Sequence, residues 1–94
     1  MKIEKGTAKN KKFKAIFYDG DKKIKTTQFG DSRYGDYILT KDKEQRKKYR
    51  TRHRKDLAKG NYMSAGHLSY FLLWGDSVSL NSNIKKYKKM FNLT

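Results

Sequence analysis

Residues 41–55 read KDKEQRKKYRTRHRK, and this stretch indicates how the rest of the 94-residue chain is organised. It holds nine Lys or Arg against two acids, so it supplies +7 of the net charge of +15. Good helix formers fill it and no Gly or Pro follows before Gly60, which predicts one long helix. Asp42, with Gln45 three residues later, is typical of a capping box, and Gly60 suits the position just past a helix end.

The two sides of this predicted helix differ in character. At 100° per residue Arg46, Tyr49, His53 and Leu57 share one side, which we expect to dock on the rest of the protein. The other cations have few acids between them, whereas a merely solvated face usually alternates in sign. Such a row repels itself unless an anion lies nearby. The predicted polyanion contacts are Lys47, Lys48, Arg50, Arg52, Arg54 and Lys55.

Composition limits the classes of protein that this chain can form. Ninety-four residues make one domain with a small core, and the aromatic fraction of 14% argues against disorder. Without cysteine there is no disulfide, thiolate metal site or thiol nucleophile. We expect no signal peptide, because residues 1–12 are charged. The longest apolar run, residues 70–74, is too short to span a bilayer.

The residues before the basic stretch predict a β-hairpin. Residues 1–10 are polar and are expected to form a flexible basic arm, ahead of a single α+β domain over residues 11–94. Alternation over residues 13–18, the turn signal Asp19-Gly20 and the return over 22–29 predict two antiparallel strands, with Ile24 facing Ala15. Residues 30–40 read as a loop anchored by Tyr34 and Tyr37.

The residues after the basic stretch predict two more helices. Ser64 can cap a helix over residues 65–74 that is apolar nearly all round, so it should form the buried centre. Its expected core residues are Leu68, Phe71, Leu72 and Trp74. Ser77 or Ser79 can cap the third helix, whose apolar stripe is Leu80, Ile84, Tyr87 and Phe91. Its outer face carries further predicted phosphate contacts, Lys85, Lys86, Lys88 and Lys89, without the Arg or Gln that read bases. The predicted fold is therefore an N-terminal β-hairpin packed on three helices.

The sequence favours no catalytic or metal site. A zinc site needs three or four protein ligands, and the chain offers two histidines and no cysteine. His53 is expected to bridge to Asp56 or to a backbone carbonyl, and His67 lies in the first turn of the apolar helix. No acid–base pair of carboxylates is evident, so we expect neither an enzyme nor a cofactor. Trp74 fits the core better than a base-stacking platform.

The chain resembles a known family over roughly residues 12–91, including the hairpin, most clearly from residue 29 onward. The residues that carry the resemblance are, in order, Phe29-Gly30, Asp36-Tyr37, Lys41-Asp42, Arg46-Lys47, Tyr49, Arg52-His53, Ala65-Gly66, Ser69 and Leu72-Leu73-Trp74. They resemble a family of small basic proteins of unassigned function encoded by large nucleocytoplasmic DNA viruses of the mimivirus and phycodnavirus type. The chain departs from that family at Thr40, Tyr62 and residues 67–70. The resemblance implies a virion-associated protein of the infected host cytoplasm or nucleus, and it implies no reaction.

Charge and resemblance together favour a non-enzymatic protein that binds nucleic-acid phosphate backbone with little sequence preference. Of the two nucleic acids, we expect DNA ahead of RNA as the partner. The alternative is a minor capsid protein whose basic surface bridges acidic capsid subunits. A steep salt dependence of binding distinguishes the first hypothesis from the second.

Overall fold

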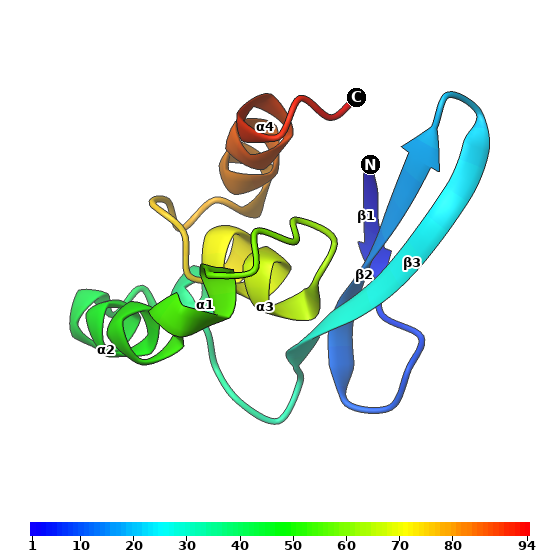
Figure 1. Ribbon diagram of the computed structural model, residues 1–94. Coiled ribbons are helices and arrows are strands. Elements are labelled where there is room, and N and C mark those ends of the chain that lie inside the picture. The colour runs from blue at the N-terminus through cyan, green and yellow to red at the C-terminus, as the bar shows by residue number, and fades with distance from the viewer.

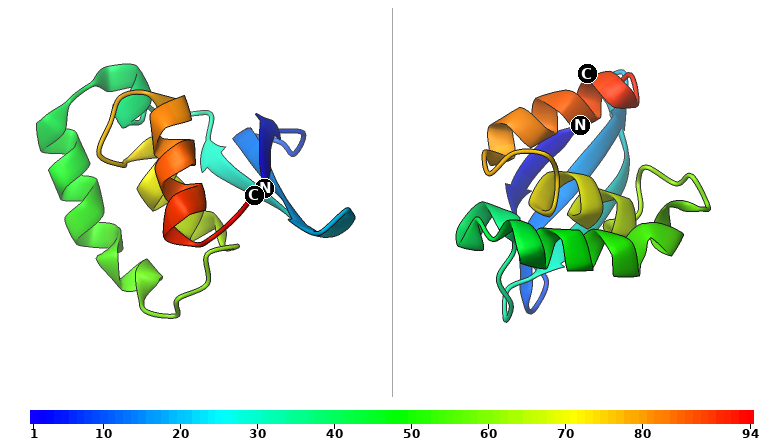
Figure 2. Two further views of the ribbon diagram at one scale, coloured as in Figure 1. Left: turned by 90° about the horizontal axis from the view of Figure 1, so that it is seen from above. Right: turned by 90° about the vertical axis from the view of Figure 1, so that its left-hand side faces the viewer.

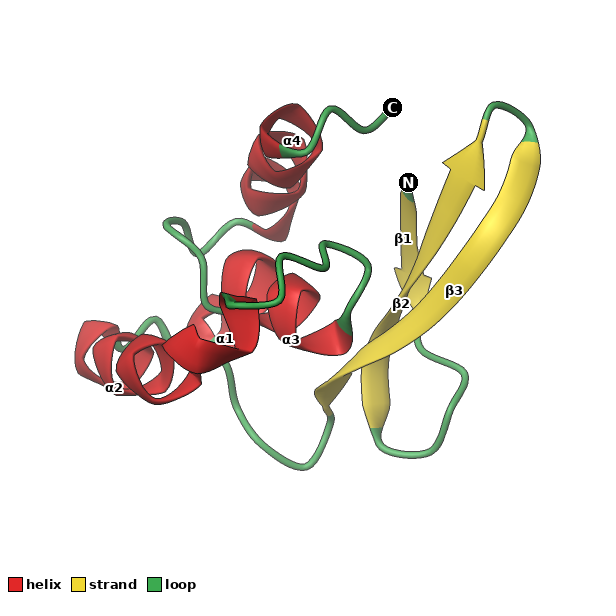
Figure 3. Cartoon of the chain, in the orientation of Figure 1, coloured by secondary structure: helices red, strands yellow, loops and turns green.

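The computed structural model describes residues 1–94 and has an α+β architecture, as predicted, with a three-stranded antiparallel sheet and helices gathered on one side of it (Figures 1 and 3). The sheet has the order β1 (Lys2–Lys5), β2 (Lys11–Asp19), β3 (Lys22–Asp31). The helical elements are α1 (Tyr37–Thr40), α2 (Lys43–His53), the 3₁₀ turn η1 (Arg54–Leu57), α3 (Ala65–Leu68), the π turn η2 (Ser69–Leu73) and α4 (Leu80–Met90). None of these helices is both long and apolar enough to cross a membrane.

The strands predicted over residues 13–18 and 22–29 form the β2–β3 hairpin, with details that differ from the prediction. The turn lies at Gly20 and Asp21, one residue later than predicted, because Asp19 pairs with Lys22 and Gly20 adopts a φ of +62°. The later turn and a register irregularity between Phe17 and Tyr18 together place Thr27, not Ile24, opposite Ala15. Ile24 is consequently exposed, and the prediction that it faces Ala15 was wrong.

The N-terminal segment differs from the flexible arm that its polarity predicted. Lys2–Lys5 form an edge strand whose Ile3 lies opposite Ala15 of β2. Met1 is buried, and its amino group donates to the Thr94 carbonyl at 2.6 Å, so the two ends of the chain lie together (Figure 2). Lys and Glu are common on edge strands because their charge opposes further strand pairing. Lys and Glu make residues 2–5 hydrophilic, which is why the sequence predicted an arm, but they do not prevent the segment from forming a strand.

The core lies between the inner face of the sheet and the central helical segment α3–η2. Phe17 and Phe29 from the sheet, and Leu68 and Leu72 from the helical segment, are almost fully buried. Trp74 is 6% exposed, which confirms its predicted place in the core. Phe71 is only partly buried and packs against this cluster. The whole cluster comprises Met1, Ala15, Phe17, Phe29, Tyr37, Leu68, Leu72, Leu73, Trp74 and Tyr87.

The predicted N-caps are present, whereas the capping box and the interiors of two helices differ from the prediction. Asp42, Ser64 and Ser79 each accept a hydrogen bond from a backbone N–H in the first turn that follows. The Asp42 N–H donates to the Thr40 hydroxyl and not to Gln45, which accepts from that hydroxyl, and the basic helix ends before Gly60, with Ala58 as its C-cap.

The basic helix is α-helical only to His53 and continues as the 3₁₀ turn η1. The apolar helix widens into the π turn η2, closed by a hydrogen bond from the Trp74 N–H to the Ser69 carbonyl at 3.1 Å. A π turn inserts one residue and so changes the direction of the side chains that follow it.

The turn between η2 and α4 is held by a buried amide. Asn83 donates to the Leu72 and Ser77 carbonyls at 3.0 and 2.8 Å, and it accepts from the Ser77 N–H at 3.2 Å. Gly75 is needed in this turn, because a Cβ atom there would lie 2.1 Å from the Phe71 carbonyl oxygen. The turn therefore has one fixed geometry, which places α4 against the core and presents the Gly75 carbonyl to α2.

Candidate functional site

The docking side predicted for the basic helix is confirmed. The Tyr49 ring stacks on the Trp74 ring, with centroids 4.3 Å apart and planes 9° apart. Arg46 donates from Nε to the Gly75 carbonyl at 2.6 Å and from Nη2 to Asp76 Oδ1 at 2.9 Å. Tyr49 and Arg46 thus fix the side of α2 that faces the core.

Arg50 belongs to the docked side, although the sequence predicted it among the solvent-facing cations. Its Nη1 donates to the Trp74 carbonyl at 2.7 Å, and its guanidinium lies 4.2 Å from the centroid of the Tyr70 ring. Burial lowers the pKa of Arg50 below its usual value. The long side chain reaches across to η2, so its position on the helix surface did not reveal its contacts. In this structure Arg50 connects α2 with η2.

The other five predicted contacts of the basic helix are free of acidic partners. Their side chains are exposed, and none of them forms an ion pair with a carboxylate of the chain. Five of the 24 Lys and Arg side chains form such a pair. The exposed surface of α2 and η1 therefore carries a cluster of unpaired positive charge that reaches a cleft between α2 and the sheet. We call it the α2 cation cluster, and it consists of Lys47, Lys48, Arg52, Arg54 and Lys55.

The predicted cations of α4 are less uniform. Lys85 and Lys89 are exposed, whereas Lys88 is partly buried. Lys86 pairs with Asp76, the same carboxylate that Arg46 contacts. The hydrogen bond from Lys86 lowers the pKa of Asp76, which favours the charged form of this carboxylate. Asp76 therefore links the two basic helices.

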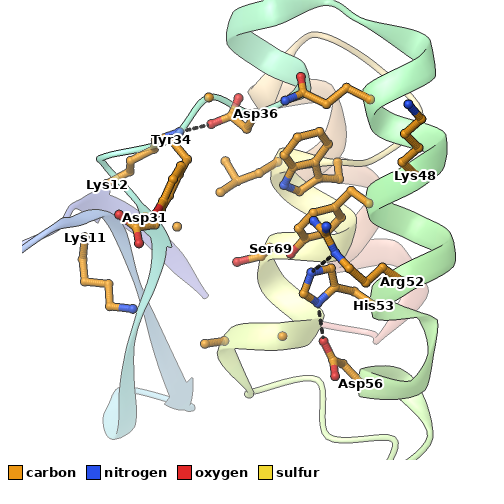
Figure 4. Close-up of a pocket in the computed structure, with 18 residues that line it drawn as sticks. Lys11, Lys12, Asp31, Tyr34, Asp36, Lys48, Arg52, His53, Asp56 and Ser69 are labelled. Atoms are coloured by element: carbon orange, nitrogen blue, oxygen red, sulfur yellow. Dashed lines mark hydrogen bonds and ion pairs between the residues drawn. The ribbon is translucent and has the colours of Figure 1, made fainter.

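A cleft of about 590 Å³ opens between the β2–β3 end of the sheet and α2, and η2 forms its floor (Figure 4). Figure 4 shows Lys11 and Tyr34 on one wall, Lys48 and Arg52 on the opposite wall, and Ser69 between them. The cleft is lined by Lys11, Lys12, Gly30, Asp31, Tyr34, Gly35, Asp36, Gln45, Lys48, Tyr49, Arg52, His53, Asp56, Ala65, Gly66, Ser69, Leu73 and Trp74.

Each carboxylate that lines the cleft already has a cationic or imidazole partner within the protein. Asp36 pairs with Lys12 at 2.5 Å, and Asp56 contacts the Nδ1 of His53 at 2.9 Å. Asp31 pairs with Arg33 at 2.8 Å, and this hydrogen bonding lowers the pKa of Asp31 to about 2. The cations of the cleft without a carboxylate partner are Lys11, Lys48 and Arg52. The cleft therefore has a surplus of positive charge.

The aromatic rings around the cleft fall into two groups. His53, Tyr49 and Trp74 form a stack, with the His53 centroid 4.2 Å from that of Tyr49. Tyr34 is expected to anchor its loop, but it is 68% exposed, and that prediction was wrong. Tyr37 is the anchor, 7% exposed and in the core. Tyr34 therefore presents an unburied ring at the cleft.

The two histidines have local partners. His53 is joined to Asp56, as predicted, and its Nε2 lies 3.4 Å from the Nε of Arg52. This arrangement fits a neutral ring with the hydrogen on Nδ1, because the Arg52 N–H donates to Nε2. Ser69 also lines the cleft, and no hydrogen bond joins it to His53. His67 contacts the Ser64 hydroxyl, and burial lowers its pKa.

Lys11 and Tyr34 are the residues of this site that sequence reasoning missed. They come from β2 and from the loop before α1, and the fold brings them opposite α2. The two glycines and the arginine of residues 30–35 are compatible with an anion-binding loop, but they lack the spacing of a phosphate-binding loop. The sequence therefore did not predict a site there.

Comparison with known proteins gives one match. The model of a family of unknown function (DUF5754) matches residues 1–53, which include the sheet, α1 and α2. The searches of curated proteins and of solved structures gave no match. The matched residues cover more than half of the chain and include the α2 wall of the cleft. The chain therefore belongs to the family DUF5754.

Proposed function

We propose that this protein is a non-enzymatic basic protein that binds the phosphate backbone of nucleic acid with little sequence preference. The observation that carries the proposal is the α2 cation cluster, whose five exposed side chains have no acidic partner in the protein. Phosphates placed along this surface would supply the missing negative charge and release their own counterions. Lys85 and Lys89 of α4 offer further contacts.

Binding through the backbone is favoured over base reading because three of the five arginines are engaged within the protein. Arg46 and Arg50 are engaged by the turn after η2, and Arg33 is engaged by Asp31. Base reading in the major groove relies on bidentate side chains such as Arg, Asn and Gln. Arg52 and Arg54 remain free, together with five exposed lysines among the predicted contacts of α2, η1 and α4, and lysines act as point charges toward phosphate.

We also propose a partner nucleic acid and a location for this protein. DNA is the expected partner, in a virion or in the cytoplasm or nucleus of an infected host cell, on the strength of the resemblance to proteins of large DNA viruses. We also propose that the working unit is the β2–β3 hairpin carried on three helical segments, of which α2 and α4 present the cations.

A salt titration of duplex binding tests the proposal. With about six phosphates neutralised, a plot of log affinity against log salt should have a slope of about −5, and two duplexes of unrelated sequence should bind alike. A slope shallower than about −2 contradicts backbone binding. Absence of DNA binding, with stoichiometric association with acidic capsid subunits, would favour the alternative role as a minor capsid protein.

A further inference from the structure

We propose that the cleft between α2 and the β2–β3 end of the sheet binds one nucleotide unit of single-stranded nucleic acid, with its base against Tyr34 and its phosphate held by Lys48 and Arg52 of α2. This inference rests on the proposed function and assigns a strand type and a specific site to it. The shared chemistry is that of a nucleoside phosphate, whether in a strand or free.

The size and position of the cleft favour an unpaired nucleotide. A volume of about 590 Å³ lies within the range of small-molecule sites, which are about 300–1,000 Å³. A nucleotide can enter such a cleft, whereas a paired base stays stacked inside its helix, and extruding it costs a few kcal/mol. A duplex would therefore contact the outer cations and leave the cleft empty.

The charge of the cleft favours a phosphate. Asp31 and Asp36 are paired with cations and Asp56 with the neutral His53. The lining cations outnumber these three carboxylates, since there are four of them, Lys11, Lys12, Lys48 and Arg52. These cations line the cleft from both walls, and the Arg52 side chain extends from α2 toward its centre (Figure 4). A phosphate between the walls would lie within reach of a guanidinium, which can bind two of its oxygens, and of an ammonium.

The aromatic side of the cleft favours a base. Tyr34 is 68% exposed, whereas the nearby Tyr37 is 7% exposed. Its loop is fixed by Arg33, which donates from Nε and from Nη2 to the two oxygens of Asp31 and lies 5.8 Å from the Tyr34 ring centroid. A fixed loop with an exposed ring is a suitable surface for stacking, and stacking tolerates any base.

The chain contains its own reporter for this site. Trp74 is the single tryptophan, and it lines the cleft. Oligothymidylate, which forms no stable secondary structure, serves as the single strand. A duplex of equal length and thymidine monophosphate are the comparison ligands. Binding is followed by the anisotropy of a label on the nucleic acid and by the fluorescence of Trp74. We expect oligothymidylate to change Trp74 fluorescence as it binds, and the duplex to bind with little change.

Matched variants identify the contacts. Tyr34→Ala should weaken oligothymidylate binding about tenfold and leave duplex binding unchanged, because stacking contributes about 1–3 kcal/mol per base. Tyr34→Phe, which keeps the ring, should bind as wild type. Lys48→Gln should reduce the preference for single strands, whereas Lys47→Gln, the neighbouring exposed lysine outside the cleft, should weaken both nucleic acids equally. Thermal melts should show all four variants folded.

The possible results separate the two proposals. If oligothymidylate binds while Trp74 fluorescence stays constant and Tyr34→Ala has no effect, the cleft assignment is wrong and backbone binding stands. If neither nucleic acid binds, the proposed function fails, and this inference fails with it. If thymidine monophosphate occupies the cleft but oligothymidylate does not, the site takes free nucleotides and the single-strand assignment is overturned.

Discussion

Replacing Arg50 by Gln separates two roles that one arginine on a basic helix can have. If Arg50 joins α2 to η2, its removal destabilises the fold; if it contacts phosphate, its removal weakens nucleic-acid binding. The structure supports the first role, because the side chain donates to the Trp74 carbonyl at 2.7 Å and lies over the Tyr70 ring. Gln preserves helix propensity, so the change isolates the guanidinium.

The expected loss of stability follows from these two contacts. A hydrogen bond from a charged donor contributes about 1.5–3 kcal/mol, and a cation–π contact about 0.5–2 kcal/mol. Arg50 is partly exposed, so we expect a combined loss of about 2–4 kcal/mol in the free energy of unfolding. For a domain of this size each kcal/mol corresponds to about 4–8 °C in Tm. The Tm of Arg50→Gln should therefore fall by roughly 10–25 °C.

The matched control is Arg54→Gln, one helical turn further along in η1. Arg54 is exposed and has no ion-pair partner, so its substitution should change stability by less than about 0.5 kcal/mol. Thermal melts followed by circular dichroism, together with DNA titrations well below the Tm, measure both properties. The reasoning is refuted if Arg50→Gln melts like wild type and loses as much DNA affinity as Arg54→Gln.

Three further predictions concern two buried side chains, Trp74 and Asn83, and the pKa of Tyr49. Trp74→Ala should lower the free energy of unfolding by about 3–5 kcal/mol, as measured by urea denaturation, because the indole is buried; an unchanged unfolding curve would place Trp74 outside the core. Asn83→Ala should cost about 2–3 kcal/mol in the same assay, because it leaves the Leu72 carbonyl without its side-chain donor and the Ser77 N–H and carbonyl without their amide partner; a loss below about 0.5 kcal/mol would show that water replaces the amide. Burial raises the pKa of Tyr49 to about 12, above its unfolded value of 10.0, so the stability that the neutral phenol supplies is present below about pH 10 and is lost as the pH rises toward 12. Burial also raises the pKa of Tyr87, so absorbance titration should show two late-ionising tyrosines, of which Tyr49→Phe removes one, and seven tyrosines with pKa values near 10 would contradict the burial.

Sequence reasoning predicted those parts of the fold that depend on local signals. The α+β class follows from alternation before residue 30 and from helical patterns after residue 42. Asp42, Ser64 and Ser79 cap helices as predicted, because an N-cap is decided by a side chain and the few N–H groups that follow it. The apolar run around Trp74 is in the core, because a segment without a polar side has no surface to present.

The features that the sequence did not predict depend on distant contacts. β1 is a strand because β2 offers it an edge, and its own residues are too polar to indicate this. The π turn η2 places the Trp74 carbonyl where Arg50 reaches it, and no residue preference marks such a turn. The cleft joins Lys11, Tyr34 and Lys48, which come from three separate elements, so only the tertiary structure shows that they share a site.

The most direct test of backbone binding by the α2 cation cluster is the salt dependence of a triple variant. Lys47, Arg54 and Lys55 are exposed, have no ion-pair partner and lie outside the cleft, so replacing all three by Gln should leave the fold and the cleft intact. The slope of log affinity against log salt for duplex DNA should become shallower by about three, one for each lost phosphate contact, while Tm stays the same or rises as like-charge repulsion is relieved. A triple variant that binds duplex DNA with the wild-type slope would contradict the account.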